Sequence, residues 1–525
     1  MIGKTLWLSG LLVSWIASRA IGAAPLDSTS AVPASAWGIR VEEETVIKPF
    51  SSRMFGLNFD WTVTQRVVLN DAGEYREDIS ELCKGFPLPL NRMAGTDSQE
   101  FRWKWAIGPM ADRLPQQLYK FFPERPVRLG PVEWVRWVRQ EDPKAQFVFV
   151  VNLLKDTPQD IADLVYFLTG RANSPRPEEA AWAKRRVQLG LPEPVPVAVW
   201  ELGNEMELKI PEKSYVWTAE QYIDASRAAI TAIRVADPKA RIALHGSSSY
   251  DPGWNQAVLR ALGAQVDYFS LHFYYQGVAF GSTQGLQGEG GFQGHTVELV
   301  ERWIDQARDE CARLVPERPL KLFISEHARW PVTPKVRDES WRKSWYQTHS
   351  LEGCLSTADF LGRWMNRPEV EMATYHSFSS GPWGLFYRDV STGKLSSTGM
   401  YELFRMLGSI EGKSVVRSEI VVPKTLSETA QAEKALHTVF AVRDEKQLTL
   451  VIVNRGKAFP LEAGISEKYV LRTGSLLTSA SLDDHNTADA RPLQVVTRPA
   501  ESWRGPGGTV EVPARAVLLL NFGVR

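Results

Sequence analysis

Apolar runs rich in β-branched residues alternate along most of this chain with amphipathic stretches, and the alternation predicts strands followed by helices. The segment Val195–Glu205 is apolar over its first half and stops abruptly in a polar turn that carries a carboxylate. The segment Leu320–Glu326 has the same character. Such runs are typical of parallel strands that are buried on both faces.

Eight strands of this kind, with helices between them, predict a (β/α)8 TIM barrel over residues 54–411. The predicted strands are Met54–Phe59, Leu88–Arg92, Gln146–Val151, the segment from Val195, Arg241–His245, Val266–Leu271, Leu320–Ser325 and Met372–Phe378. The predicted helices are Pro131–Gln140, Thr157–Gly170, Thr218–Asp237, His295–Leu314, Glu339–Met365 and Met400–Leu407. Capping residues at Thr157 and Thr218 mark two helix starts.

Beyond residue 411 the pattern changes to short alternating runs with turns between them. This texture predicts an antiparallel β-sandwich over residues 412–525. The segment 24–53 contains one further alternating strand near Val41. Because a strand outside the barrel needs a sheet to pair with, we expect it to join the sandwich.

The first residues have the pattern of a secretory signal peptide, which we place at residues 1–23. Lys4 supplies the positive charge, Leu6–Ala17 is an apolar core too short to span a bilayer, and the small residues Ala20–Ala24 offer a cleavage site. We therefore expect a secreted or periplasmic protein.

Composition excludes several classes of partner. Lysine plus arginine and aspartate plus glutamate both number 61, so no charge excess indicates nucleic acid or an anionic membrane. The three cysteines, Cys83, Cys311 and Cys354, allow at most one disulfide, whose existence stays open. No Cys-x-x-Cys or His-Glu-x-x-His occurs, and we expect neither a metal nor a cofactor. The glycine-rich loop after Tyr274 lacks the context of a nucleotide site and predicts a mobile lid.

Polar side chains gather at the predicted strand ends, where TIM barrels hold their active sites. The candidates are Asp60, Arg92, Asn152, Asn204, Glu205, His245, His272, Tyr274, Glu326, His327 and His376. Trp383, after the last strand, is a candidate ring for stacking on a sugar, although a place in the core is equally compatible.

The two glutamates at strand ends indicate glycoside hydrolysis. One carboxyl must give a proton to the leaving oxygen, while the other must be ionised to attack the anomeric carbon. Donors such as Arg92 or Tyr274 hold one carboxylate ionised. We expect Glu205 and Glu326 to lie about 5–5.5 Å apart, which is the separation of retaining enzymes.

These residues also carry a family resemblance. The motif Trp200–Glu205 resembles the Asn-Glu motif of the retaining glycosidases of clan A. Within that clan, three segments resemble the α-L-arabinofuranosidases of glycoside hydrolase family 51, namely His245–Ser248, Val266–Tyr274 and Trp105–Pro109, as does Pro513–Val517 near the C-terminus.

The resemblance implies roles for the candidate residues. Glu205 would be the acid/base and Glu326 the nucleophile, and Asn204 would bind the hydroxyl next to the anomeric carbon. His272 and Tyr274 would orient the glutamates. The predicted substrate-binding residues are Asp60, Arg92, Asn152, Asn204, His272, Tyr274 and Trp383.

Three departures from the family pattern leave the sugar open. The family's Arg-x-Pro-Gly-Gly is Arg92–Gly95 here, its strand-one glutamate is replaced by Asp60, and its Asp-Glu-Trp is Ser325–His327. Another clan A activity, such as that of a β-xylosidase, β-glucuronidase or endo-glucanase, therefore remains an alternative.

Two other classes of protein are compatible with parts of this pattern. The strand-end histidines fit a metal-dependent hydrolase, but such barrels use a His-x-His pair on strand one and Met54–Trp61 has no histidine. A catalytically inactive carbohydrate-binding protein would not need both glutamates.

Overall fold

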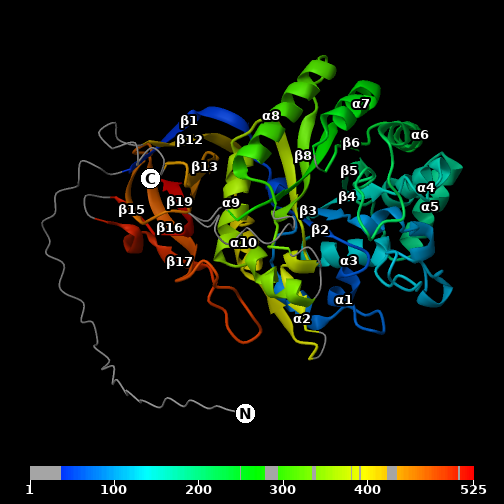
Figure 1. The fold of residues 1–525 in the computed structure, drawn as a ribbon, viewed down its shortest axis with the longest axis horizontal. Coiled ribbons are helices and arrows are strands. Elements are labelled where there is room, and N and C mark those ends of the chain that lie inside the picture. The colour runs from blue at the N-terminus through cyan, green and yellow to red at the C-terminus, as the bar shows by residue number, and fades with distance from the viewer. Residues whose placement is uncertain are drawn as a thin grey trace, which may run out of the picture.

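The computed structural model describes residues 37–248, 250–277, 294–333, 339–379, 381–389, 392–421, 434–505 and 509–525 (Figure 1). The predicted signal peptide and most of the predicted lid after Tyr274 lie outside these ranges. None of the helices in the described ranges combines the length and apolarity needed to cross a bilayer. All three cysteines lie in the described part, where each is buried and free.

A closed barrel of eight parallel strands forms the larger part of the fold and confirms the predicted class. The strands in order are β2 (Gly56–Phe59), β3 (Leu90–Met93), β4 (Gln146–Val151), β5 (Val197–Leu202), β6 (Ile242–His245), β7 (Tyr268–Tyr275), β8 (Lys321–Arg329) and β9 (Val370–Tyr375). Seven of these strands, β3 to β9, each contribute one buried residue to a cluster inside the barrel. These residues are Leu90, Val148, Val199, Ala243, Tyr268, Phe323 and Met372. Because side chains on a strand alternate, residues two positions further on face the same interior.

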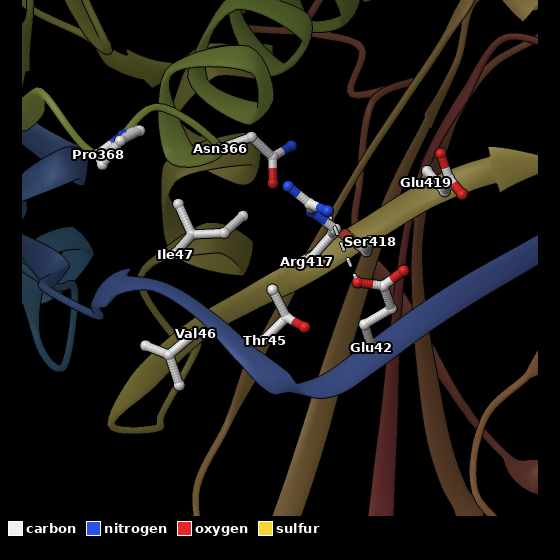
Figure 2. A pocket seen from close by; sticks show the side chains of 9 residues that line it. All are labelled: Glu42, Thr45, Val46, Ile47, Asn366, Pro368, Arg417, Ser418 and Glu419. Atoms are coloured by element: carbon white, nitrogen blue, oxygen red, sulfur yellow. Dashed lines mark ion pairs between the residues drawn. The ribbon is translucent and has the colours of Figure 1, made fainter.

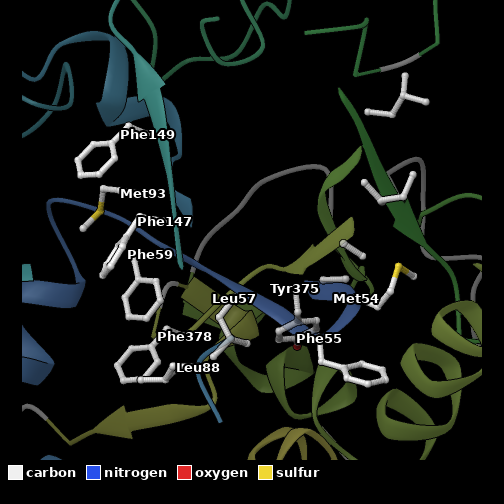
Figure 3. Packing of buried hydrophobic residues seen from close by; sticks show 14 of the residues in the cluster. Met54, Phe55, Leu57, Phe59, Leu88, Met93, Phe147, Phe149, Tyr375 and Phe378 are labelled. Carbon is white, nitrogen blue, oxygen red and sulfur yellow. The ribbon is translucent and has the colours of Figure 1, made fainter. Parts of the chain in front are cut away.

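The outward faces of the strands pack against helices. Phe59, Phe147 and Phe149 come from β2 and β4 and lie in one buried group with Met93 of β3 (Figure 3). Trp134 of α3 (Pro131–Glu141) meets the rings of Phe147 and Phe149 edge-on, at centroid distances of 5.1 and 5.2 Å. This aromatic layer fixes α3 against the barrel.

The helices that follow the strands agree with most of the predicted starts. In addition to α3 they are α1 (Thr64–Val68), α2 (Glu77–Cys83), α4 (Pro158–Thr169), α5 (Pro177–Gln188), α6 (Ala219–Ala236), α7 (Pro252–Leu262), α8 (Val297–Leu314), α9 (Leu351–Met365) and α10 (Gly399–Leu407). Thr157 and Thr218 cap α4 and α6 through their side chains, as predicted. Helices α1, α2, α5 and α7 were not predicted.

The single helix predicted over Glu339–Met365 is wrong. Residues Glu339–Thr348 form a 3-10 helix, and α9 starts separately because the side chain of Ser350 accepts from the backbone N–H of Gly353. The periodicity continued across this boundary, but the serine cap ends one element and begins the next.

A nine-stranded sheet, mostly antiparallel, lies beside the barrel (Figure 1). Its order is β17 (Val496–Pro499), β16 (Tyr469–Thr478), β19 (Ala516–Val524), β14 (Gln447–Asn454), β13 (His437–Arg443), β12 (Ser414–Val421), β1 (Trp37–Pro49), β15 (Phe459–Gly464) and β18 (Val510–Val512). The strand predicted near Val41 is β1, which runs antiparallel to β12 and parallel to β15.

The two faces of this sheet have different partners. Phe440, Val451 and Leu519 belong to the large core that is shared with the barrel helices. Their neighbours Ile452 and Leu518 point the other way, into a second core within the sheet. Helix α9, which contacts both β8 and β13, lies between the two parts.

Lys48 of β1 joins the sheet to the end of α9. Its ammonium donates to the carbonyl oxygens of Trp364, Arg367 and Val370 at 2.9, 3.0 and 2.7 Å, and the residue is buried. Trp364 lies in the last turn of α9 and Arg367 just beyond it, and a cation is favourable at that end of a helix. Their carbonyls also accept from the backbone N–H groups of Arg367 and Val370, so the ammonium is an additional donor.

Replacing this lysine is therefore expected to weaken the junction. Lys48→Met removes the ammonium that three carbonyls share and should lower the free energy of unfolding by about 1–3 kcal/mol. Urea unfolding followed by tryptophan fluorescence measures the change. Lys413→Met, at an exposed lysine on the neighbouring segment, is the matched control, and equal stability of the two variants would contradict the assigned role.

Candidate active site

The cleft at the carboxyl ends of the barrel strands has a volume of about 440 Å³. It is lined by carboxylates, aromatic rings and one wall of aliphatic residues. The lining residues are Asp60, Gly95, Thr96, Tyr119, Asn204, Glu205, Leu208, Ile210, Glu212, Ser248, Tyr274, His295, Glu326, Trp330, His376 and Trp383.

Arg92 is fully buried beneath the cleft and hydrogen-bonds two of the residues that line it, Asn204 and Glu326. Its Nε donates to Glu201 at 2.5 Å, and Nη1 donates to Asn58 at 2.9 Å and to Glu326 at 3.1 Å. Its Nη2 donates to Asn204 at 2.9 Å and lies 3.4 Å from His272 Nε2. Burial alone would lower the pKa of Arg92, but the carboxylates of Glu201 and Glu326 outweigh burial and raise it. The guanidinium is thus a fixed positive charge under the site.

Glu326 reaches the cleft because β8 contains a bulge. The register pairs Leu271 with Ile324 and then His272 with Glu326, so Ser325 is the extra residue. Phe323 faces the barrel interior, and simple alternation would turn Glu326 outward. The bulge turns its side chain inward instead, which is a known use of this irregularity.

The partners of Glu326 keep it ionised. Tyr274 Oη donates to it at 2.8 Å, and Arg92 donates from the other side. Although burial raises the pKa of Glu326, the positive charges of His272, His376 and Arg92, together with the Tyr274 hydrogen bond, lower it to about 2. A buried carboxylate of this kind is suited to act as a nucleophile.

Glu205 follows β5 in a left-handed backbone conformation, with φ at 48°. His272 Nδ1 lies 2.9 Å from Glu205 Oε1 and 3.4 Å from Glu326 Oε2, so one imidazole lies between the two carboxyls. Burial acts to lower the pKa of His272, but Glu326 and Glu205 raise it. Carboxylate oxygens of Glu205 and Glu326 lie within 4.8 Å of each other, which is compatible with the 5–5.5 Å between the carboxyl groups of retaining enzymes.

The predicted substrate-binding residues lie in three places: in the lining of the cleft, beneath that lining, and, for Asn152, in the turn after β4. Asp60, Asn204, Tyr274 and Trp383 line the cleft. Arg92 and His272 lie beneath its lining and act on the glutamates and Asn204, so they position the site and are not among the residues that line it.

Asn152 is a correction. Its side chain donates to the carbonyl of Phe101 at 2.9 Å and accepts from the backbone N–H groups of Leu154 and Lys155. It therefore fixes the turn after β4, and it is not among the described residues that line the cleft.

Of the other strand-end histidines, only His376 lines the cleft. His245 is buried beneath His272, with their rings 4.7 Å apart. His327 is buried against Trp364 with a ring distance of 5.0 Å. Trp383 packs against Trp330 at 4.9 Å and Tyr274 at 5.5 Å, which makes an aromatic wall.

Sequence reasoning missed several residues of the site. Glu201 is fully buried and forms the ion pair with Arg92. A signal existed, because Glu201 interrupts an apolar strand two positions after Val199, which faces the interior. Tyr119, Glu212 and His295 enter from loops, where periodicity carries no information.

Two clusters have the spacing of metal ligands, namely Glu205–His272–Glu326 and Glu201–His245–His272. Arg92 contacts members of both clusters. A cation bound there would face this buried guanidinium at short range, which is unfavourable. The donor sets therefore do not fit a resident metal ion.

A second cavity, of about 540 Å³, lies between β1, β12 and the end of α9 (Figure 2). Glu42 and Arg417 face each other across it, with an ion-pair distance of 3.8 Å. Asn366 and Ile47 complete its sides. Its described lining contains no aromatic ring, and Glu42 is paired with Arg417, so the barrel mouth is the better candidate for chemistry.

A (β/α)8 barrel that carries two close glutamates at the ends of β5 and β8 has the arrangement of the retaining glycoside hydrolases. Comparison with known proteins narrows the class. The family model of the α-L-arabinofuranosidase 1 domain matches residues 91–287. This finding and those that follow agree with the resemblance to family 51 that the motifs indicated.

Two curated relatives are similar over most of the chain. An intracellular exo-α-(1→5)-L-arabinofuranosidase of Streptomyces lividans is 25% identical over 461 residues, which cover 82% of this chain and 65% of that protein. An exo-α-(1→6)-L-arabinofuranosidase of Bifidobacterium longum is 25% identical over 489 residues, which cover 84% of this chain and 87% of that protein. The chain spans about two fifths of the length of another relative, an intracellular exo-α-(1→5)-L-arabinofuranosidase of Acetivibrio thermocellus.

Solved structures share the fold. An α-L-arabinofuranosidase from Thermotoga maritima superposes with a TM-score of 0.73 at 19% identity, covering 93% of this chain and all of that one. A family 51 α-L-arabinofuranosidase from Bifidobacterium longum superposes with a TM-score of 0.74 at 18% identity, covering 94% of this chain and all of that one.

The hydroxyl of Tyr274 is expected to matter through Glu326. A hydrogen bond to a charged group contributes about 1.5–3 kcal/mol, so Tyr274→Phe should lower kcat/KM on an aryl glycoside roughly 10- to 100-fold. Loss of the donor raises the pKa of Glu326, and the acid limb of the pH profile should move to higher pH because Glu326 must be ionised to attack.

Tyr387→Phe is the control for this variant, since its hydroxyl donates to the carbonyl of Pro382 at 2.5 Å. That exchange removes a buried hydroxyl near the site without touching Glu326. An acid limb that stays in place in Tyr274→Phe would contradict the assigned interaction.

Proposed function

We propose that the protein is a retaining glycoside hydrolase that removes α-L-arabinofuranosyl residues from plant-type polysaccharide or oligosaccharide side chains. The observation that carries the proposal is the pair Glu205 and Glu326, which come from β5 and β8 and have carboxylate oxygens within 4.8 Å of each other. His272 contacts both.

The chemistry runs in two displacements. In the first, the Glu326 carboxylate forms a bond to the anomeric carbon while the bond to the leaving oxygen breaks, and Glu205 donates a proton to that oxygen. In the second, Glu205 takes a proton from water, whose oxygen attacks the same carbon and releases Glu326. Two inversions give net retention. Arg92 and Tyr274 favour the ionised form of Glu326, so part of the cost of preparing the nucleophile is met before substrate binds.

The charge of the cleft supports a neutral sugar. Asp60, Glu205, Glu212 and Glu326 line it, and among the described lining residues there is no lysine or arginine. A uronic acid carboxylate would meet four acidic side chains without a lysine or arginine in the described lining to pair with it, which argues against a β-glucuronidase. The names of the relatives point to arabinofuranose as the sugar.

The wild-type protein tested on a panel of 4-nitrophenyl glycosides should hydrolyse the α-L-arabinofuranoside fastest. Glu326→Ala should abolish turnover because no other group can form the covalent intermediate. Glu205→Ala should be milder on this good leaving group, and added azide should restore its rate because azide attacks without a general base.

Proton NMR in the first minutes of hydrolysis identifies the product anomer. A product of inverted configuration, or near-normal turnover by Glu326→Ala, would mean that the nucleophile is assigned wrongly. A xyloside or glucoside preferred over the arabinofuranoside would keep the mechanism and correct the sugar.

Export is part of the proposal and rests on the pattern of residues 1–23. The Streptomyces relative is named as intracellular, so location is a point on which this chain would differ. Expression of the full chain in a bacterium with a general secretion pathway should give a secreted or periplasmic protein shortened by about 22 residues. Intact-mass measurement of active material that retains Met1 in the cytoplasm would overturn this part of the proposal.

A further inference from the structure

The backbone of Glu205 is held in a conformation that an L-residue avoids. Its φ of 48° lies in the left-handed region, which costs about 1–2 kcal/mol for a residue with a side chain. Gly203, two positions earlier, also has a positive φ of 74°, but glycine adopts it freely. The conformation of Glu205 therefore needs support from its surroundings.

That support comes from the loop that follows. The carbonyl oxygen of Glu205 accepts from the backbone N–H of Leu208 at 3.1 Å and also from the side-chain ammonium of Lys213. Lys213 is 7% exposed, which is rare for a lysine. Its ammonium lies 5.1 Å from the ring centre of Tyr215, which covers it on one side.

The same loop builds one wall of the cleft. Leu208, Ile210 and Glu212 line the cleft between Glu205 and Lys213. The hydrogen bond from Lys213 back to Glu205 thus closes the loop on itself and ties the wall to the residue that it faces.

The charge of Lys213 also acts on the site. Burial lowers its pKa, and the carboxylates of Glu205, Glu207 and Glu326 oppose that effect. The ammonium therefore lies in the field of both candidate catalytic glutamates, although its hydrogen bond goes to the backbone of one of them.

We propose that Lys213 is a positioning residue for Glu205. Its hydrogen bond to the Glu205 carbonyl fixes the left-handed backbone that directs the Glu205 carboxyl into the cleft, so proton transfer depends on Lys213 although Lys213 does not touch the substrate. This inference rests on the function proposed above, in which Glu205 is the acid/base. It adds a residue from a loop outside the barrel strands to the machinery of proton transfer.

The test compares leaving groups. Lys213→Met keeps an unbranched side chain that is one atom shorter, and it removes the donor and the charge. On a methyl glycoside, whose leaving group needs a proton, kcat should fall roughly 10- to 100-fold, a part of the 10²–10⁴ that general acid–base catalysis supplies. On the 4-nitrophenyl glycoside of the same sugar the first step should be nearly unchanged, so kcat/KM should stay within about twofold, and azide should raise kcat.

Lys209→Met is the matched control, because Lys209 is an exposed lysine of the same loop. It removes the same charge nearby and should leave both substrates unaffected. Both glycosides carry whichever sugar the wild-type protein hydrolyses.

Equal losses on both substrates without azide rescue would overturn the proposal, since a merely structural role lowers all rates alike. So would wild-type behaviour of Lys213→Met. If that variant fails to fold by thermal unfolding, Lys213→Gln keeps a donor without the charge and is measured in the same way. Failure of both to fold would show a role in folding alone and overturn the proposal. Absence of any glycoside turnover by the wild-type protein would instead overturn the proposed function.

Discussion

The buried guanidinium of Arg92 is the interaction on which the site depends. It has five N–H donors in a rigid plane, and its four partners come from three strands: Asn58 from β2, Glu201 and Asn204 from β5 and the turn after it, and Glu326 from β8. A charge with no exposure is costly unless it is fully paired. Here the two carboxylates supply the pairing, so the arginine and the barrel interior stabilise each other only when all partners are in place.

This arrangement explains how one barrel interior can be apolar at one level and charged at the next. Leu90 and Val199 face the interior in the apolar layer, and Arg92 and Glu201 follow them two residues later on the same strands. The apolar layer excludes water from below. In such surroundings the fields of His272, His376 and Arg92 on Glu326 are screened less than they would be at a surface. Together with the hydrogen bond from Tyr274 they keep the pKa of this buried carboxyl low.

The sequence allowed the barrel, the two glutamates and most of the strand ends to be predicted, because buried parallel strands leave long apolar runs and barrels place chemistry where those runs stop. It did not allow a prediction of which strand-end side chains line the cleft and which lie buried beneath it. Arg92 and His272 end strands as Tyr274 does, yet they lie under the cleft, and Asn152 turns back to the backbone of its own loop. Depth depends on register between strands, which a single sequence does not contain. Contacts such as Lys48 with α9 join residues more than 300 positions apart, and no local pattern marks them.

Both candidate catalytic residues owe their direction to irregular backbone. Regular alternation from Phe323 would point Glu326 at the helices, and the bulge at Ser325 reverses it. The carbonyl of Ser325 is held by Asn58 and Thr374, at 2.9 and 2.6 Å. Asn58 is in turn bonded to Arg92. The guanidinium that sets the charge of Glu326 is therefore also connected, through one asparagine, to the bulge that sets its direction.

Glu205 shows the same principle on the opposite side of the cleft, with a left-handed residue in place of a bulge. In both cases the strain of an irregular backbone is balanced by buried polar contacts and not by apolar packing. Such contacts are directional, whereas apolar packing tolerates small shifts. A pair of carboxyls whose separation decides between retention and inversion requires that directional control, and this accounts for a floor built of arginine, asparagine and histidine beneath an otherwise apolar barrel.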